Sequence, residues 1–288
     1  MATRGEVQLL RGIRVSSSSA EYVFGSSGTE QQRLIDQAEA LEPQASWLLD
    51  RLRVEAGWRV ADIGCGPVGI LNLLSERVGA KGEVVGIERE QRFAELARRE
   101  IEKRRLKNVI VVQGDALGPN ETSEQFDLVH ERLVLLNLPQ CDQLTVVEQM
   151  VSRLKPGGLI ALQEYDAVSL VCFPEHPSWT ILLDAYAEAF RSHGGNRATG
   201  RTLHSLLRSV GVGPIEMKVH ARHLEVGDSQ RTVLLTLVEL MQDRIMELGR
   251  FSESEFKEHQ KRLFLHLADP DTLVIDRLLI QAWGRKPL

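Results

Sequence analysis

Acidic residues and glycines in the first half of the chain have the types and spacing of a ligand-binding loop. Gly64, Gly66 and Gly69 form a G-x-G-x-x-G pattern after the apolar stretch 60–63, which carries Asp62. Glycine lets the backbone turn tightly and approach a ligand, and amide groups at the start of the following helix add partial positive charge. The pattern alone is also typical of nicotinamide and flavin enzymes. Asp62 would repel a pyrophosphate, so it favours a ligand whose nearby end is cationic.

Two further acids follow later apolar stretches. Glu88 ends the stretch 84–88, roughly twenty residues beyond the glycine loop, where an acid can accept hydrogen bonds from both hydroxyls of a ribose. Asp115 follows the stretch 109–112, within the segment Gly114-Asp115-Ala116. By itself, Asp115 could equally be a turn-forming aspartate.

Continuous apolar stretches predict the elements that position these residues. Such stretches are typical of parallel strands buried on both faces, and they occur at 60–63, 84–88, 109–112, 126–129 and 159–162. A charged helix is expected over 90–105, with its arginines on a solvated face. Ligands bind outside the carboxyl ends of strands in open α/β sheets. His130, Glu131 and Arg132 are therefore expected at the same site.

The segment Asp62-Ile63-Gly64-Cys65-Gly66-Pro67-Val68-Gly69 resembles the first motif of the class I S-adenosylmethionine-dependent methyltransferases. Three more segments match that family in the right order: Gly114-Asp115-Ala116, which resembles its adenine contact, the strand 126–129, and the turn Leu154-Lys155-Pro156-Gly157-Gly158 into a fifth strand. The resemblance implies an α/β fold with a Rossmann-like, seven-stranded methyltransferase sheet. It also implies S-adenosylmethionine as the cofactor.

The resemblance and the spacing together give a set of cofactor-binding residues spread over several loops. The set comprises Tyr22, Gln37, Asp62, Gly64, Cys65, Gly66, Gly69, Glu88, Arg89, Gly114, Asp115, Ala116, His130 and Arg132. Cys65 is expected to pack within the loop rather than to act as a nucleophile.

Residues 1–57 are expected to form an N-terminal leader with lid helices, and 58–288 the cofactor-binding domain. Residues 1–20 look like a loose lead-in. A helix is expected to begin near Thr29 as its N-cap, and Pro43 is expected to stop or restart it. These helices either cover an edge of the sheet or, as in many methyltransferases that this chain resembles, lie over the cofactor. Tyr22 and Gln37 would then touch it.

The second half of the chain predicts a helix over 177–192 and a strand over 215–221 with one apolar and one charged face. Two helices then form an insertion, about 228–270, before a last antiparallel strand over 278–283. The insertion could be structural bulk, a wall of the acceptor pocket or a dimer contact. No internal repeat and no second domain with its own strand pattern is evident.

Methyl transfer needs positioning and exclusion of water more than covalent help, so the acceptor side is harder to predict. A base is useful only when the acceptor is a hydroxyl or a protonated amine. Asp166 and His193 are the residues expected to take a proton, although His193 could instead cap a helix. The wider set of acceptor-side candidates is Arg132, Asn137, Glu164, Tyr165, Asp166, His176 and His193.

Composition limits the classes of partner. The chain has 288 residues and a net charge of −5, which argues against nucleic acid and anionic membrane surfaces as partners. Three widely spaced cysteines suggest reduced thiols and a cytoplasmic location. The eight histidines do not cluster at metal-ligand spacing, so no metal is expected. No apolar run approaches a membrane span, and the first residues lack a signal peptide's apolar segment.

Three functions remain open. The leading one is methyl transfer to an O, N or C nucleophile of a small molecule, in secondary metabolite or cofactor biosynthesis, by a monomer or homodimer. Methylation of RNA or protein is the second, supported only by the basic segment 98–107. The third is a methyltransferase-like protein that binds the cofactor without transferring its methyl group. A nicotinamide oxidoreductase is contradicted by Asp62 and by the Lys-Pro-Gly-Gly turn.

Overall fold

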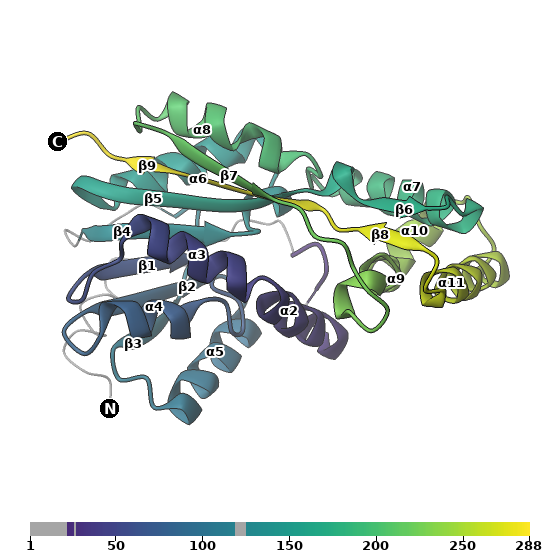
Figure 1. The fold of residues 1–288 in the computed structure, drawn as a ribbon, viewed down its shortest axis with the longest axis horizontal. Helices are drawn as coiled ribbons and strands as arrows, with labels where there is room; N and C mark the ends of the chain where they lie inside the picture. The colour runs from purple at the N-terminus through teal and green to yellow at the C-terminus, as the bar shows by residue number, and fades with distance from the viewer. Residues whose placement is uncertain (1–21, 26, 119–124) are drawn as a thin grey trace.

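A seven-stranded mixed sheet organises the chain in a computed structural model, which describes residues 22–25, 27–118 and 125–288 (Figure 1). The strand order is β3-β2-β1-β4-β5-β9-β7. The bounds are β1 Arg59–Ile63, β2 Glu83–Glu88, β3 Val109–Gln113, β4 Phe126–Arg132, β5 Leu154–Asp166, β7 Glu216–His220 and β9 Leu278–Arg285. Neighbours from β3 to β5 are parallel, and β9 is antiparallel to both β5 and β7. The predicted α/β Rossmann-like methyltransferase fold is confirmed.

The parallel register brings the expected ligand-binding loops to one edge of the sheet. Ile63 pairs with Ile87 of β2 and with Glu131 of β4, so these three strands end at the same level. The chain order reverses between β1 and β4, which is the point where open α/β sheets bind ligands. The apolar residues of β1 are fully buried, as expected for a strand covered on both faces.

Helices cover both faces of the sheet. They are α3 Glu42–Leu52, α4 Leu71–Val78, α5 Gln91–Arg104, α6 Gln140–Ser152 and α8 Leu203–Ser209, whereas α2 Gly28–Ala40 packs on α3. The predicted N-cap at Thr29 is wrong: Ser27 caps α2 by accepting a hydrogen bond from the Glu30 amide at 3.2 Å. Pro43 occupies the first turn of α3, where proline is tolerated, so it restarts the helix. The expected lead-in 1–20 lies outside the described residues.

A helical lobe extends beyond the end of the sheet, on the right of Figure 1. It contains α7 Pro177–Ser192 and the insertion between β7 and β9, which holds α9 Val233–Leu240, α10 Gln242–Glu247 and α11 Glu253–Ala268. Its own apolar cluster includes Leu182, Phe190 and Phe256. Two three-residue strands, β6 Val171–Phe173 and β8 Leu273–Ile275, pair antiparallel in the same lobe. This small sheet and the break between α9 and α10 were not predicted.

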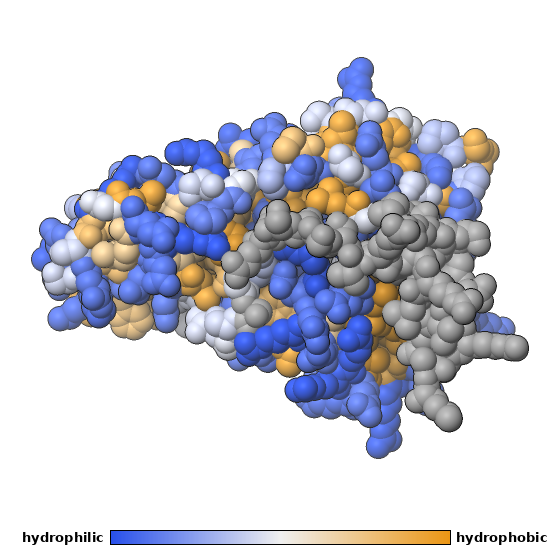
Figure 2. Space-filling model, turned by 180° about the vertical axis from the view of Figure 1, so that it is seen from behind, coloured by the Kyte–Doolittle hydropathy of each residue, from blue (hydrophilic) through white to orange (hydrophobic). Residues whose placement is uncertain are grey.

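Four of the five residues of strand β7 are exposed, on its charged face as well as on its apolar face. Its charged face lies against α3, where Arg51 forms an ion pair with Glu216 and Trp47 makes an edge contact with His220. Its apolar residues Met217 and Val219 are 41% and 49% exposed. An edge strand without a helix over one face leaves that face open. Hydrophilic residues predominate on the surface seen in Figure 2, and the apolar ones form separate patches.

None of the helices formed by the described residues is long and apolar enough to cross a membrane.

Candidate cofactor and acceptor site

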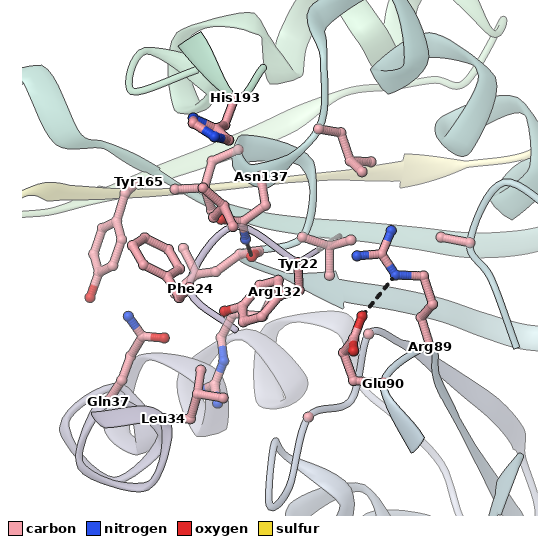
Figure 3. Close-up of a pocket in the computed structure, with 18 of the residues that line it drawn as sticks. Tyr22, Phe24, Leu34, Gln37, Arg89, Glu90, Arg132, Asn137, Tyr165 and His193 are labelled. Atoms are coloured by element: carbon pink, nitrogen blue, oxygen red, sulfur yellow. Dashed lines mark hydrogen bonds and ion pairs between the residues drawn. The ribbon is translucent and has the colours of Figure 1, made fainter. Parts of the chain in front are cut away.

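A cavity opens at the carboxyl edge of the sheet and extends under the helical lobe (Figure 3). Its walls come from the loops after β1 to β4, from α2 and from α7 and α9. Ten of the residues predicted to bind a cofactor line it: Tyr22, Gln37, Gly64, Gly66, Glu88, Arg89, Gly114, Asp115, Ala116 and Arg132. Loops that are far apart in the sequence thus meet at one place, because their strands end together.

A second, smaller cavity adjoins the first and holds the other four predicted residues. It shares Gln37, Gly64, Gly66 and Arg132 with the main cavity. Among its additional lining residues are the other four predicted ones, Asp62, Cys65, Gly69 and His130.

The glycine loop requires glycine at two of its positions. Gly64 has a φ of +64°, and a Cβ there would lie 2.4 Å from Val134 Cγ2. A Cβ at Gly69 would lie 2.3 Å from the Cys65 carbonyl oxygen. Cys65 itself is buried, and burial raises the pKa of its thiol, so this cysteine packs in the loop.

Glu88 holds the loops after β1 and β2 together. Its Oε2 accepts a hydrogen bond from the Gly66 amide at 2.9 Å, and its Oε1 accepts one from the Glu90 amide at 2.8 Å. Burial raises the pKa of this carboxyl group. Each carboxylate oxygen can accept more than one hydrogen bond, so both can still receive the hydroxyls of a ribose. Arg89 beside it pairs with Glu90 at 3.2 Å (Figure 3).

Two buried polar atoms on the cavity wall lack partners and show which ligand groups the cavity can accept. Asp115 is 5% exposed and accepts the Leu117 amide through Oδ1 at 2.9 Å, whereas its buried Oδ2 has no hydrogen-bond partner among the described residues. Nη1 of Arg132 is also buried and unpartnered within that part of the chain. An acceptor atom suits the exocyclic amine of adenine, and a guanidinium suits a carboxylate. The residues therefore fit S-adenosylmethionine.

A chain of buried side chains across the sheet fixes Asp62. His130 Nδ1 lies 2.6 Å from Asp62 Oδ1, and Gln163 Nε2 lies 2.6 Å from His130 Nε2. Because the Gln163 amide nitrogen donates to Nε2, the His130 proton lies on Nδ1 and is donated to Asp62. Gln163 in turn accepts a hydrogen bond from Gln281 at 2.7 Å, and His220 donates to Gln281 at 2.9 Å. His130 thus acts as a residue that positions Asp62.

The loop after β4 separates the two ends of the cavity, and two buried acids hold it. Glu131 accepts a hydrogen bond from the Val134 amide, and Glu164 accepts one from the Leu136 amide, both at 3.2 Å. The two carboxyl groups interact directly, and burial raises the pKa of both, that of Glu131 to about 8. Leu133 in this loop has a φ of +60°, an uncommon conformation for leucine that is typical of functional sites.

The end of the cavity under the lobe has a different lining. Phe24, Leu183, Tyr186, Leu234 and Leu237 supply its apolar surface. Arg197 and Arg277 supply guanidinium groups, and Tyr165 supplies a hydroxyl. The sequence had indicated Tyr165 and the apolar insertion, but neither arginine, because no local pattern shows that the loop after α7 and the start of β9 converge.

The two residues predicted to take a proton have different positions. His193 is an exposed residue at the cavity, where it is the C-cap of α7, with Nδ1 3.0 Å from the Ala189 carbonyl oxygen. Asp166 is not among the residues that line either cavity. Its carboxylate instead accepts hydrogen bonds from Arg201 at 2.9 Å and from the Val168 amide at 3.3 Å. Asp166 is therefore unsuited to act as a base here.

The other acceptor-side candidates divide in the same way. Asn137 and Tyr165 line the cavity (Figure 3). Glu164 lies behind the loop after β4, and His176 is the N-cap of α7, accepting a hydrogen bond from the Ser178 amide at 3.1 Å.

Comparison with known proteins agrees with this geometry. A family model described as a methyltransferase domain matches residues 55–195, which include the glycine loop, Glu88 and Asp115. Residues 55–195 form a methyltransferase domain of the class I S-adenosylmethionine-dependent superfamily. The matched segment ends before the helical insertion, so Leu234 and Leu237 of the far wall lie outside it, whereas Leu183 and Tyr186 lie within it.

Similar curated proteins include demethylmenaquinone methyltransferases. That of a Geobacillus strain is 30% identical over 43% of this chain and 53% of its own length. That of Lactobacillus johnsonii is 32% identical over 43% of this chain and 52% of its own length. The chain thus spans about half the length of the curated relatives it matches.

Solved structures show the same fold. The YcgJ protein of Bacillus subtilis superposes with a TM-score of 0.56 at 16% identity, covering 85% of this chain and 99% of its own. The phosphoethanolamine N-methyltransferase 2 of Haemonchus contortus, solved with phosphomonomethylethanolamine and S-adenosylhomocysteine, gives a TM-score of 0.52 at 17% identity. The match covers 85% of this chain and 53% of that one.

Proposed function

We propose that this chain transfers a methyl group from S-adenosylmethionine to a small molecule. The observation that carries the proposal is a single cavity with two chemically distinct ends. One end presents Glu88 and the unpartnered Oδ2 of Asp115 to a nucleoside. The other end has an apolar lining, as small-molecule sites do.

Each residue at the first end would bind a different group of the cofactor. Asp115 would accept a hydrogen bond from the adenine amine, Glu88 would accept those of the ribose hydroxyls, Arg132 would bind the carboxylate and Asp62 the ammonium group. S-adenosylmethionine supplies an electrophilic methyl carbon: an acceptor lone pair forms the new bond as the carbon–sulfur bond breaks, releasing S-adenosylhomocysteine and any proton that the acceptor carried.

The chain's own contribution is to position the acceptor and to exclude water. Phe24 is buried on Phe190, with ring centroids 5.8 Å apart, and Tyr22 meets Phe24 edge-on. The rings of Tyr22 and Phe24 line the cavity. Holding two reactants in line in a dry site can supply much of the rate acceleration of a displacement. His193 is the one predicted base that reaches the cavity, and we propose it for that role only where the acceptor must lose a proton.

A small molecule fits better than RNA or protein. Part of the basic segment of α5 is engaged locally, since Arg104 and Lys103 both pair with Glu100. Arg98 donates to the Val111 carbonyl instead of facing a partner. The names of the curated relatives extend the proposal to cofactor biosynthesis, where a ring-shaped acceptor would suit the aromatic and leucine lining.

The test is to incubate the protein with methyl-labelled S-adenosylmethionine and, in parallel, with cell-derived small metabolites, total RNA and total protein. Label is expected in the small-metabolite fraction alone. Label in RNA or protein only would contradict the small-molecule assignment. Label in no fraction, despite tight cofactor binding, would favour a protein that holds the cofactor without transferring its methyl group.

A further inference from the structure

The acceptor end of the cavity is cationic as well as apolar. We propose that the acceptor is an organic anion, a ring-sized apolar body carrying a carboxylate or a similar acidic group, which Arg197 and Arg277 bind. The inference rests on the proposed function and names the class of its acceptor. It is carried by buried donor groups that lack partners and by the distribution of charge along the cavity.

Arg197 presents a donor that the described part of the protein leaves unused. Its Nη2 donates to the Ala167 carbonyl oxygen at 2.7 Å, and its guanidinium carbon lies 5.9 Å from the centre of the Tyr186 ring. Its Nε is buried and has no hydrogen-bond partner within that part of the chain. A buried guanidinium N–H is costly to leave unpaired. An anion bound at this point would satisfy it.

The position of Arg197 is fixed by the loop that carries it. Gly195 packs so closely on the Phe190 ring that a Cβ would lie 2.4 Å from it. Asn196 donates its amide to the Leu136 carbonyl oxygen at 2.8 Å and accepts the Ala198 amide at 2.9 Å. The guanidinium is thus held before any acceptor binds, which lowers the entropy cost of recognition.

Arg277 and Tyr165 form the second half of the proposed anion site. Arg277 is 6% exposed, and its guanidinium carbon lies 4.1 Å from the centre of the Tyr165 ring. Asp276 accepts a hydrogen bond from its Nε and Gln230 one from its Nη2, both at 3.0 Å. The Tyr165 hydroxyl is buried and lacks a partner among the described residues, and in Figure 3 it points toward Gln37. Both side chains line the cavity.

Charge along the cavity favours an anion over an amine at this end. The lining carboxylates Glu88, Glu90 and Asp115 belong to the loops after β2 and β3, at the nucleoside end. A fourth, Asp142, lies in the first turn of α6. No carboxylate within the described residues forms an ion pair with Arg197 at 4.0 Å or less. Asp276 pairs with Arg277 at 3.0 Å and balances its charge, so the guanidinium of Arg197 carries the uncompensated positive charge that would repel a cationic acceptor in this poorly solvated place.

The apolar lining indicates the shape and polarity of the rest of the acceptor molecule. Phe24 and Tyr186 contribute rings, and Leu183, Leu234 and Leu237 contribute branched side chains. Aromatic and aliphatic walls of this kind suit a flat or bulky hydrocarbon body.

The experiment compares 2-naphthoate with its neutral isostere 2-naphthamide, titrated by calorimetry into the full chain saturated with S-adenosylhomocysteine. The wild-type protein should bind naphthoate at least tenfold more tightly than naphthamide. Arg197→Gln should weaken naphthoate binding about tenfold and leave naphthamide binding unchanged, because one charge-assisted hydrogen bond is lost. Arg191→Gln, which changes an exposed arginine of α7 outside the cavity, is the matched control and should change neither.

Tyr165→Phe is a second variant, since it removes only the hydroxyl, and it should weaken naphthoate binding severalfold. Unchanged thermal melting would show that each variant is folded. Equal binding of the two probes, preference for the amide, binding of neither, or an unaltered naphthoate affinity in Arg197→Gln would each overturn the inference. Cofactor binding measured first keeps the two claims apart: loss of S-adenosylhomocysteine binding contradicts the proposed function, whereas cofactor binding without preference for the anion contradicts only the acceptor class.

Discussion

A single oxygen atom of Asp115 gives the sharpest prediction at the residue scale. In Asp115→Asn the side-chain oxygen can still accept the Leu117 amide, but the nitrogen then replaces the unpartnered Oδ2 and opposes the adenine amine with another donor. Cofactor affinity should fall by about 1.5 to 3 kcal/mol, or roughly ten- to a hundredfold. Asp142→Asn, which changes a cavity carboxylate in α6, should leave it unchanged. Equal cofactor affinities of Asp115→Asn and the wild type would exclude the assigned adenine contact.

Variants of His130 distinguish a residue that positions Asp62 from one that contacts the cofactor. His130→Ala leaves Asp62 without the donor that holds its carboxylate and leaves Gln163 without its buried partner. The variant should lose about 1 to 3 kcal/mol of folding free energy, and cofactor binding should weaken severalfold. Urea unfolding and calorimetry measure the two effects. His130→Asn, which can still donate to Asp62, should recover part of the affinity, whereas an identical loss in both variants would contradict the positioning role.

At the scale of elements, the two buried acids that hold the loop after β4 should make the folding stability depend on pH. The raised pKa values mean that the folded protein retains a proton that the unfolded chain releases above pH 4.5. A group that binds more protons when folded contributes stability that is lost as pH rises, here through the folded-state pKa of about 8 for Glu131. Stability in urea should therefore fall from about pH 5 to about pH 8, with a slope of up to about 1.4 kcal/mol per pH unit for one proton, and the contribution of Glu131 to the slope should vanish above its folded-state pKa.

Glu164→Gln should make that slope shallower, because Glu164 no longer titrates, while Glu131 still does. The glutamine amide can donate to Glu131 as a protonated carboxyl group does, and it does not titrate, while its oxygen still accepts the Leu136 amide. Glu175→Gln, an exposed change in the same half of the chain, is the control. A wild-type slope that persists in Glu164→Gln would mean that Glu164 does not contribute to the pH dependence.

Helix α2 is the element we propose as a lid, because Leu34 and Gln37 line the cavity from it. Binding of S-adenosylhomocysteine should slow amide hydrogen exchange in residues 28–40 and in the loop after β4. Exchange in α11, which packs in the lobe and does not line the cavity, should stay the same. If saturation with S-adenosylhomocysteine leaves the exchange in α2 unchanged, the helix is a fixed cover of the sheet edge and not a lid.

At the scale of the whole molecule, the sheet and the nucleoside end could be predicted because they rest on local signals. Each parallel strand is a continuous apolar stretch, and Asp62, Glu88 and Asp115 follow three of them at family spacing. The acceptor end depends on contacts between distant segments, which no short pattern records. Arg277 and Arg197 meet only because β9 returns beside β5 and the loop after α7 folds over it. The three-residue strands β6 and β8 are too short to show alternation.

The central claim is that the carboxyl edge of this sheet binds S-adenosylmethionine, and calorimetric titration tests it most directly. The wild-type chain should bind S-adenosylmethionine and S-adenosylhomocysteine with one-to-one stoichiometry, and Asp115→Asn should weaken both to the extent given above. NAD should produce no binding heat, because Asp62 faces the place where its pyrophosphate would lie. Tight binding of NAD, with no binding of either sulfur nucleoside, would contradict the account.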